Sequence, residues 1–154
     1  MSCMGYNENV GEMMKSERQK LIKKLDTIFS RFIRQRDKGV CITCGRSQEW
    51  KLTDCGHYIR RGVYQFRWNE KNCNCQCKKC NGWNEGEKDI YRRKLVEMYG
   101  KDIIEIMEAD RHKPCKISIG DIRVLIAHYT KKLGGTNGKV IIKRRRHERP
   151  NRKR

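Results

Sequence analysis

The spacing of four cysteines constrains the fold of this chain more than any other feature. Cys41 and Cys44 form one CxxC pair, and Cys77 and Cys80 form a second pair further along the chain. Each CxxC places two sulfur atoms on a tight turn, and two such turns can close a tetrahedral zinc site. A site of four thiolates leaves no open position on the metal. We therefore expect a structural Zn²⁺ ion that stabilises the fold and does not activate water.

Disulfides, or ordinary buried and redox-active thiols, are the alternative use of these cysteines. The chain has 9 cysteines, an odd number, and its first residues carry no hydrophobic signal region. A disulfide framework belongs to oxidising compartments, which this sequence does not indicate. Metal-bound thiolates are therefore the preferred interpretation.

The charge balance indicates a polyanionic partner. The chain carries 37 Lys and Arg against 18 Asp and Glu, a formal net charge of +19. In a chain of this size such an excess favours nucleic acid, with DNA as the first candidate. No apolar run approaches the roughly 18 residues of a membrane span, so we expect no membrane partner and a cytoplasmic location.

The hydrophobic pattern predicts a single domain over residues 16–135. The ends are read from composition alone: 1–15 as a flexible N-terminus, and 136–154, rich in Lys and Arg, as a disordered basic tail. Within the domain we expect a helix at 16–37, a metal module at 41–88 and further helices over 89–134.

Helix signals set these boundaries. Gly39 follows the first helix, Gly100 separates two later ones, and Ser118 with Asp121 resembles a capping box that opens the last. Residues expected on the inward faces of the two helices around Gly100 are Ile90, Leu95, Met98, Ile103, Ile106 and Met107.

A specific constellation lies around the second cysteine pair. His57 falls on a strand-like segment, Asn72 precedes the second CxxC by five residues, and Asn81 follows it directly. This pattern resembles the His, Asn and final Asn or His of zinc-stabilised HNH nucleases. The wider run, from Asp54-Cys-Gly-His-Tyr to Gln76-Cys-Lys-Lys-Cys-Asn81, is similar to the NinG or Rap recombination endonucleases of lambdoid phages, and the likeness covers roughly residues 25–100.

The resemblance implies a fold and an activity. The fold would be α+β, a small ββα-metal (HNH, treble-clef-like) zinc module flanked by helices. The activity would be metal-dependent hydrolysis of DNA, leaving a 5′ phosphate, with Mg²⁺ or Mn²⁺ on the scissile phosphate. The substrates would be branched recombination intermediates such as Holliday junctions and displacement loops, cut during phage recombination. A two-fold homodimer would present two sites to a four-way junction.

The resemblance also implies roles for individual residues. His57 would be the general base, since a neutral imidazole accepts a proton near pH 7. Asn81 would supply an oxygen to the catalytic ion. Asp54 would be the second ligand, because Gly56 stands where HNH enzymes commonly carry an acid or His. Asn72 would tie the strands or the loop together and hold the His57 ring in position. The simpler interpretation of Asn72 is an ordinary asparagine in a turn.

Basic residues would position the DNA backbone. Arg60, Arg61, Arg67 and Lys71 lie in or beside the loop between the strands, where phosphate contacts are expected, although each could singly be a solvated surface charge. Arg144, Arg145 and Arg146 in the basic tail would add affinity for almost any DNA.

Two other functional classes compete with the nuclease. A zinc-stabilised DNA-binding protein without catalysis explains the charge and the cysteines, but not the spacing of His57, Asn72 and Asn81. A zinc deaminase is the other class, but this chain lacks the His-x-Glu and Pro-Cys-x-x-Cys motifs of those enzymes. Cys55, Cys73 and Cys75 are expected to serve packing, or to stand as spare thiolates beside the zinc.

Overall fold

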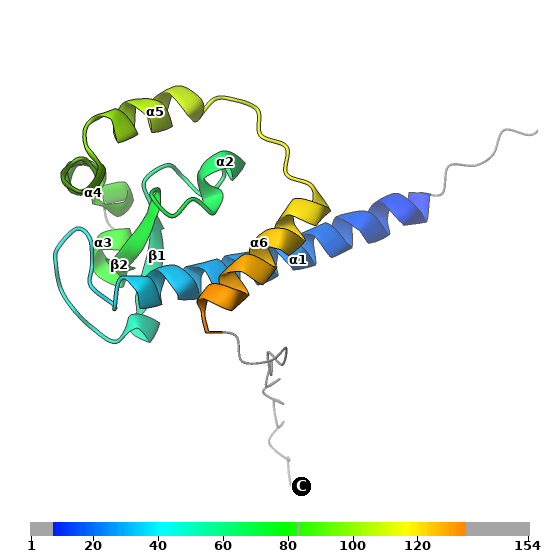
Figure 1. The fold of residues 1–154 in the computed structure, drawn as a ribbon, viewed down its shortest axis with the longest axis horizontal. Helices are drawn as coiled ribbons and strands as arrows, with labels where there is room; N and C mark the ends of the chain where they lie inside the picture. The colour runs from blue at the N-terminus through cyan, green and yellow to red at the C-terminus, as the bar shows by residue number, and fades with distance from the viewer. Residues whose placement is uncertain (1–7, 83, 135–154) are drawn as a thin grey trace, which may run out of the picture.

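The computed structural model describes residues 8–82 and 84–134 and shows an α+β protein, a set of helices around a small antiparallel sheet (Figure 1). The elements in chain order are α1 (Glu8–Arg36), the 3-10 turn η1 (Trp50–Leu52), β1 (Thr53–His57), α2 (Tyr64–Arg67), β2 (Cys73–Cys77), α3 (Lys78–Gly82), α4 (Asn84–Tyr99), α5 (Asp102–Asp110) and α6 (Ile119–Lys132). The mixed helix and strand content confirms the predicted class.

The sheet is a hairpin of two strands whose register fixes which residues share a face. Cys55 pairs with Cys75, and His57 pairs with Cys73. Residues two apart on a strand point to the same side, so the side chains of Cys55 and His57 lie on one face of β1. The helix α3 follows β2 without a gap, which brings the second CxxC pair to the end of the hairpin.

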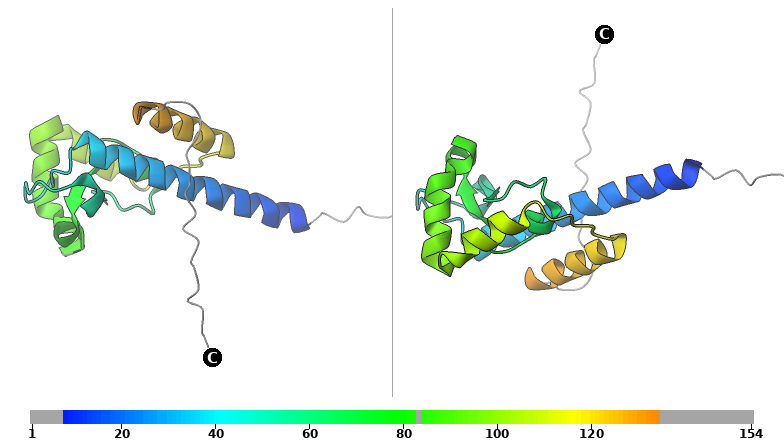
Figure 2. Two further views of the ribbon diagram at one scale, coloured as in Figure 1. Left: turned by 90° about the horizontal axis from the view of Figure 1, so that it is seen from below. Right: turned by 90° about the horizontal axis from the view of Figure 1, so that it is seen from above.

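The larger apolar core joins α1 to α6. Leu25, Phe29 and Ile33 on α1 recur at helical spacing, as predicted, and are buried. They pack against α6, where the Tyr129 ring meets the Phe29 ring edge-on with centroids 4.9 Å apart. The two helices lie beside each other in both views of Figure 2.

The last helix begins as predicted. Ser118 accepts a hydrogen bond from the backbone N–H of Asp121, and the Asp121 side chain accepts one from the Ser118 backbone N–H. This reciprocal capping box satisfies amide groups that the helix itself leaves unpaired.

A second core lies under α4 and α5, against the chain that leaves β1. Tyr58, Ile59 and Phe66 pack here with Tyr91, together with Leu95, Ile104 and Met107. Two expectations for this core are wrong, since the side chains of Met98 and Ile106 are 53% and 56% exposed. Each helix buries only one face, so an apolar residue at the margin of that face is left outside the core.

The first helix starts earlier than predicted. It begins at Glu8, where the sequence suggested a flexible segment up to residue 15. The segment 12–15 consists of Glu, Met and Lys, all strong helix formers, so propensity extends the helix beyond its packed face. The predicted basic tail with Arg144, Arg145 and Arg146 lies outside the described residues. Within the described part of the chain, no helix is both long and apolar enough to span a membrane.

Candidate functional site

The four predicted zinc ligands come together. The sulfur atoms of Cys41, Cys44, Cys77 and Cys80 lie within 4.8 Å of one another, although the two pairs are far apart in sequence. The Cys80 backbone N–H donates to Cys77 Sγ at 3.5 Å, the kind of contact by which a CxxC turn supports a thiolate. Four sulfur donors at this separation fit a tetrahedral metal ion, with zinc the expected one.

The thiols of this cluster cannot all ionise independently. Burial raises the pKa of the Cys41 thiol, but the backbone N–H of Cys44 and the Thr43 hydroxyl outweigh it and lower the value to about 6. Burial and the neighbouring sulfurs of Cys77 and Cys44 raise the pKa of Cys80 to about 12. Adjacent negative charges repel one another, and a bound cation would remove that cost.

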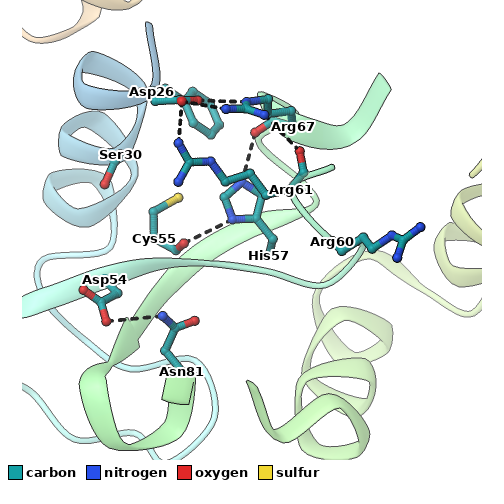
Figure 3. Close-up of a pocket in the computed structure, with 10 residues that line it drawn as sticks. Asp26, Ser30, Asp54, Cys55, His57, Arg60, Arg61, Arg67 and Asn81 are labelled. Atoms are coloured by element: carbon teal, nitrogen blue, oxygen red, sulfur yellow. Dashed lines mark hydrogen bonds and ion pairs between the residues drawn. The ribbon is translucent and has the colours of Figure 1, made fainter. Parts of the chain in front are cut away.

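His57 stands at the end of β1 with both ring nitrogens close to backbone carbonyls. Nδ1 lies 3.2 Å from the Cys55 oxygen, and Nε2 lies 3.0 Å from the Arg67 oxygen (Figure 3). Burial lowers the pKa of His57 below its ordinary value of 6.5, outweighing the two carbonyls, which raise it. A neutral imidazole has one N–H, so one of the two contacts leaves a lone pair against an oxygen.

Asp54 and Asn81 form the second part of the site. Asp54 lies on β1 and Asn81 on α3, directly after the second CxxC pair. The Asn81 Nδ2 donates to Asp54 Oδ2 at 3.2 Å. A carboxylate and an amide at this separation offer hard oxygen ligands of the kind that Mg²⁺ prefers.

One pocket of about 500 Å³ contains both parts of the site. Asp54, His57 and Asn81 line it (Figure 3). Asp54 and His57 are three residues apart on β1, so the pleat turns their side chains to opposite faces, and the pocket reaches both. The other lining residues are Asp26, Phe29, Ser30, Cys55, Arg60, Arg61 and Arg67.

Asn72 ties together the loop between the strands. Its side chain is fully buried, and its Oδ1 accepts from the Ile59 N–H at 2.7 Å. Its Nδ2 donates to the Ile59 carbonyl at 3.0 Å and to the Phe66 carbonyl at 2.9 Å. The amide therefore holds the loop that carries the Arg67 carbonyl, which in turn contacts the His57 ring.

An acid on α1, which sequence reasoning missed, organises the basic wall of the pocket. Asp26 forms an ion pair with Arg67, with Nη2 to Oδ2 at 2.7 Å, and a second one with Arg61. The Trp68 indole N–H donates to the same carboxylate at 3.0 Å. Burial raises the pKa of Asp26, but the two arginines outweigh it and lower the value. The available signal was that Asp26 is the only acid between Arg18 and Arg36.

The predicted DNA-contacting residues divide between two places. Arg60, Arg61 and Arg67 line the pocket. Lys71 does not line it, and its Nζ lies 5.7 Å from the centroid of the Tyr99 ring. Sequence reasoning also missed a second basic group, in which Arg31, Arg34 and Lys51 all lie within 6 Å of the centre of the Trp50 ring.

Cys55 and Cys73 lie beside His57 and not beside the four-cysteine cluster. One ligand atom each from Cys55, His57 and Cys73 falls within 4.8 Å of the others. The expectation of spare thiolates beside the zinc is therefore corrected for these two residues, because the strand register places Cys73 at the opposite end of the hairpin from Cys77 and Cys55 in the middle, next to His57 on its face. Burial raises the pKa of Cys73 well above its ordinary value.

The fold and the site define a class of protein: an α+β protein with a short hairpin and a four-cysteine cluster that could hold a metal ion. Comparison with known proteins gives the family. The chain matches the family described as Bacteriophage Lambda NinG protein over residues 10–137, and it belongs to that family.

Several phage proteins are similar to this chain. It is 33% identical over 116 residues to Protein ninG of Escherichia phage lambda, covering 73% of this chain and 55% of that protein. It is 34% identical over 116 residues to Protein ninG of Salmonella phage P22, with 73% and 55% covered. The chain thus spans about half the length of these relatives. No solved structure matches it.

Proposed function

We propose that this protein is a metal-dependent endonuclease of the HNH type that cuts branched DNA, such as Holliday junctions and displacement loops, in phage recombination within the host cytoplasm. The observation that carries the proposal is the single pocket lined by His57, Asp54 and Asn81 together with three arginines. An imidazole, a pair of hard oxygen ligands and a basic wall are the groups that phosphodiester hydrolysis requires.

Three further features support the proposal. Two strands followed by a helix, with the short helix α2 in the connection between the strands, agree with the order expected of a ββα-metal module. The net charge of +19 suits a DNA partner. The four-cysteine cluster lies at the end of the hairpin, and none of its residues lines the pocket. This position suits a structural zinc ion and leaves catalysis to other residues.

The carboxylate of Asp54 and the amide oxygen of Asn81 would hold the catalytic divalent ion. When bound, Mg²⁺ or Mn²⁺ supplies positive charge that stabilises the phosphoryl oxygens and the leaving 3′ oxygen. The Asn81 amide now donates to Asp54, so its oxygen is directed elsewhere than at the carboxylate. Joint ligation needs the Asn81 amide to rotate, so that its oxygen and the Asp54 carboxylate face the same ion.

His57 would take the proton from the attacking water. Burial lowers the pKa of His57, so the ring is neutral at pH 7 and can act as a base. Its Nδ1 can donate to the Cys55 carbonyl, which leaves the lone pair on Nε2. That lone pair faces the Arg67 carbonyl at 3.0 Å, a repulsive contact that favours a small turn of the ring toward water in the pocket.

The arginines would bind and orient the phosphate backbone. Asp26 holds Arg61 and Arg67 on the pocket wall, so their side chains are in place before DNA binds. Fixing them in advance reduces the entropy lost on binding. The exposed Arg60, at the mouth of the same pocket, adds a third cation.

A DNA-binding protein without cleavage is the second candidate. One specific observation favours it: both ring nitrogens of His57 contact backbone carbonyls, so in this arrangement neither is directed at a water molecule. This candidate would use the same arginines and the Trp50 group, without chemistry at His57.

The experiment compares cleavage of a four-way junction and of linear duplex by the chain loaded with one zinc ion at the four-cysteine cluster, with and without Mg²⁺. Magnesium is omitted and not chelated, because a chelator would also remove the zinc. We expect junction cleavage that needs Mg²⁺ and that falls by about 10²–10⁴-fold in His57→Ala. The matched control is His112→Ala, an exposed histidine away from the pocket. Junction binding without any cleavage by the wild-type chain would select the second candidate.

A further inference from the structure

A second cluster of metal-ligating groups lies at the wall of the pocket. Cys55 and His57 project from the same face of β1, and Cys73 is the cross-strand partner of His57 on β2. One ligand atom from each falls within 4.8 Å of the others. The hairpin register creates this group, which shares no residue with the four-cysteine cluster.

The donor set selects a soft or borderline ion. Two cysteine sulfurs and one imidazole nitrogen form a Cys₂His set, which suits Zn²⁺ and is foreign to Mg²⁺. Three protein ligands leave a fourth position open. Cys73 is fully buried, while Cys55 and His57 are partly exposed and line the pocket, so the open position faces the pocket.

The Arg67 carbonyl lies beside both the His57 ring and Cys73, and it favours Nε2 as the nitrogen of the cluster. This oxygen lies 3.0 Å from His57 Nε2 and 3.7 Å from Cys73 Sγ. Nε2 and the Cys73 sulfur therefore share one neighbour. With Nδ1 donating to the Cys55 carbonyl, the bare lone pair of Nε2 points at an oxygen, and a cation between the nitrogen and the sulfurs would relieve that repulsion.

We propose that Cys55, His57 and Cys73 form a second metal site, for Zn²⁺, and that an ion bound there occupies the His57 lone pair and stops DNA cleavage. Binding breaks two S–H bonds and forms two Zn–S bonds and one Zn–N bond; the two protons pass to solvent and nothing is oxidised or reduced. The loss of cleavage rests on the function proposed above, whereas the metal site itself does not.

Packing alone is a weaker account of these cysteines. Cys73 belongs to the core between α1 and α6, and Cys55 packs against it, so both could serve as small apolar residues. Packing does not require an imidazole beside two thiols. It also does not explain why this group opens into the pocket that holds Asp54 and Asn81.

The first experiment counts metal ions on the full chain. The reduced protein is equilibrated with a small excess of Zn²⁺, freed of unbound metal, and analysed for zinc per chain. We expect two ions in the wild type and one in Cys55→Ser and in His57→Ala. The matched control is Cys115→Ser, which removes an exposed cysteine outside both clusters and should retain two. Cys55 is chosen over the fully buried Cys73, whose replacement could disturb folding.

Cobalt gives a second readout that does not depend on activity. Zinc is first bound at the four-cysteine cluster with one equivalent, and Co²⁺ is then added. We expect sulfur-to-cobalt charge-transfer absorption from the second equivalent in wild type and Cys115→Ser, and its loss in Cys55→Ser. One zinc ion in the wild type, or a second ion that persists in Cys55→Ser, would overturn the proposed site.

The inhibition is tested by titrating Zn²⁺ into a junction-cleavage reaction at fixed Mg²⁺. Each variant starts with one zinc ion at the four-cysteine cluster and is compared with its own rate before further zinc is added. For the same fractional loss of cleavage, we expect Cys55→Ser to need at least roughly tenfold more zinc than Cys115→Ser. Removing a residue that only supports a metal ligand already lowers metal affinity by about that factor, and Cys55 is a ligand of the proposed site. Equal zinc sensitivity would overturn the inhibition. A wild type that can bind two zinc ions, but that cleaves no junction even when loaded with only one, would refute the endonuclease and leave the metal site standing.

Discussion

Replacing Asn72 with alanine tests whether one buried amide holds the loop of the site. The Asn72 side chain is fully buried and makes three close hydrogen bonds to backbone groups. Alanine keeps the backbone but removes all three. The Ile59 N–H and the Ile59 carbonyl would then be buried without a partner, and the Phe66 carbonyl would keep its weaker 3.3 Å bond from the Asn69 N–H.

The expected cost follows from those three groups. A buried donor or acceptor left unsatisfied costs about 1–3 kcal/mol. Two such groups give about 2–6 kcal/mol, and the lost bond to the Phe66 carbonyl adds about 0.5–1.5 kcal/mol. A water molecule entering the space left by the amide would restore part of this loss, so we expect about 3–6 kcal/mol. A domain is stable by about 5–15 kcal/mol, so this loss is a large fraction of the whole.

Urea unfolding of the zinc-loaded chain, followed by tryptophan fluorescence at a fixed excess of zinc, measures this loss. With a urea dependence of about 1–3 kcal/mol per molar, the midpoint of Asn72→Ala should fall by at least about 1 M. The matched control is Asn81→Ala, which loses one partly exposed hydrogen bond of 3.2 Å to Asp54 and about 0.5–1.5 kcal/mol. Equal midpoints for the two variants would refute the reasoning.

Three further predictions follow from the site. Gly56→Ala should cost about 1–3 kcal/mol in thermal unfolding, because its Cβ would lie 2.0 Å from Gln76 Oε1, and a double-mutant cycle with Gln76→Ala should show coupling; additive losses would contradict the clash. Burial lowers the pKa of His57 in the folded chain. As the pH falls below about 6.5, the unfolded chain therefore takes up a proton before the folded chain does, and stability drops in that window. Urea midpoints of wild type and His57→Ala that run parallel between pH 5 and 7 would speak against this. Asp26→Asn should slow junction cleavage, because it frees two arginines from the pocket wall. It should not weaken DNA binding in a gel-shift assay, because it also removes a negative charge. Weaker binding would show that Asp26 does more than position the two arginines.

Local patterns accounted for much of the fold. The CxxC spacing brought four sulfurs together, because a tight turn sets the distance within each pair. The capping box at Ser118 and the apolar stripe of α1 with Leu25 and Phe29 were equally local. Each of these signals lies within a few residues, where the backbone geometry leaves few alternatives.

Features that depend on register or on distant partners were not visible in the sequence. Nothing local says that Cys73 will face His57, because a shift of one residue in the pairing would turn it to the other side of the sheet. Asp26 meets Arg67 only after α1 has packed across the hairpin. The outward position of Ile106 likewise reflects how α5 sits on its neighbours, which periodicity alone does not determine.

For the nuclease that we propose, Gly56 explains why the acid of the site is Asp54 and not the residue directly before His57. A Cβ at Gly56 would meet Gln76 Oε1 at 2.0 Å, so the buried Gln76 side chain occupies the space that a carboxylate before His57 would need. Gln76 is itself fixed by donating to the Gly86 carbonyl at 2.8 Å. Asp54 is the next residue of β1 on the same face as Gly56, and it is the strand partner of Gln76. A carboxylate at Asp54 has room on this face, and it lies where the Asn81 amide on α3 can reach it.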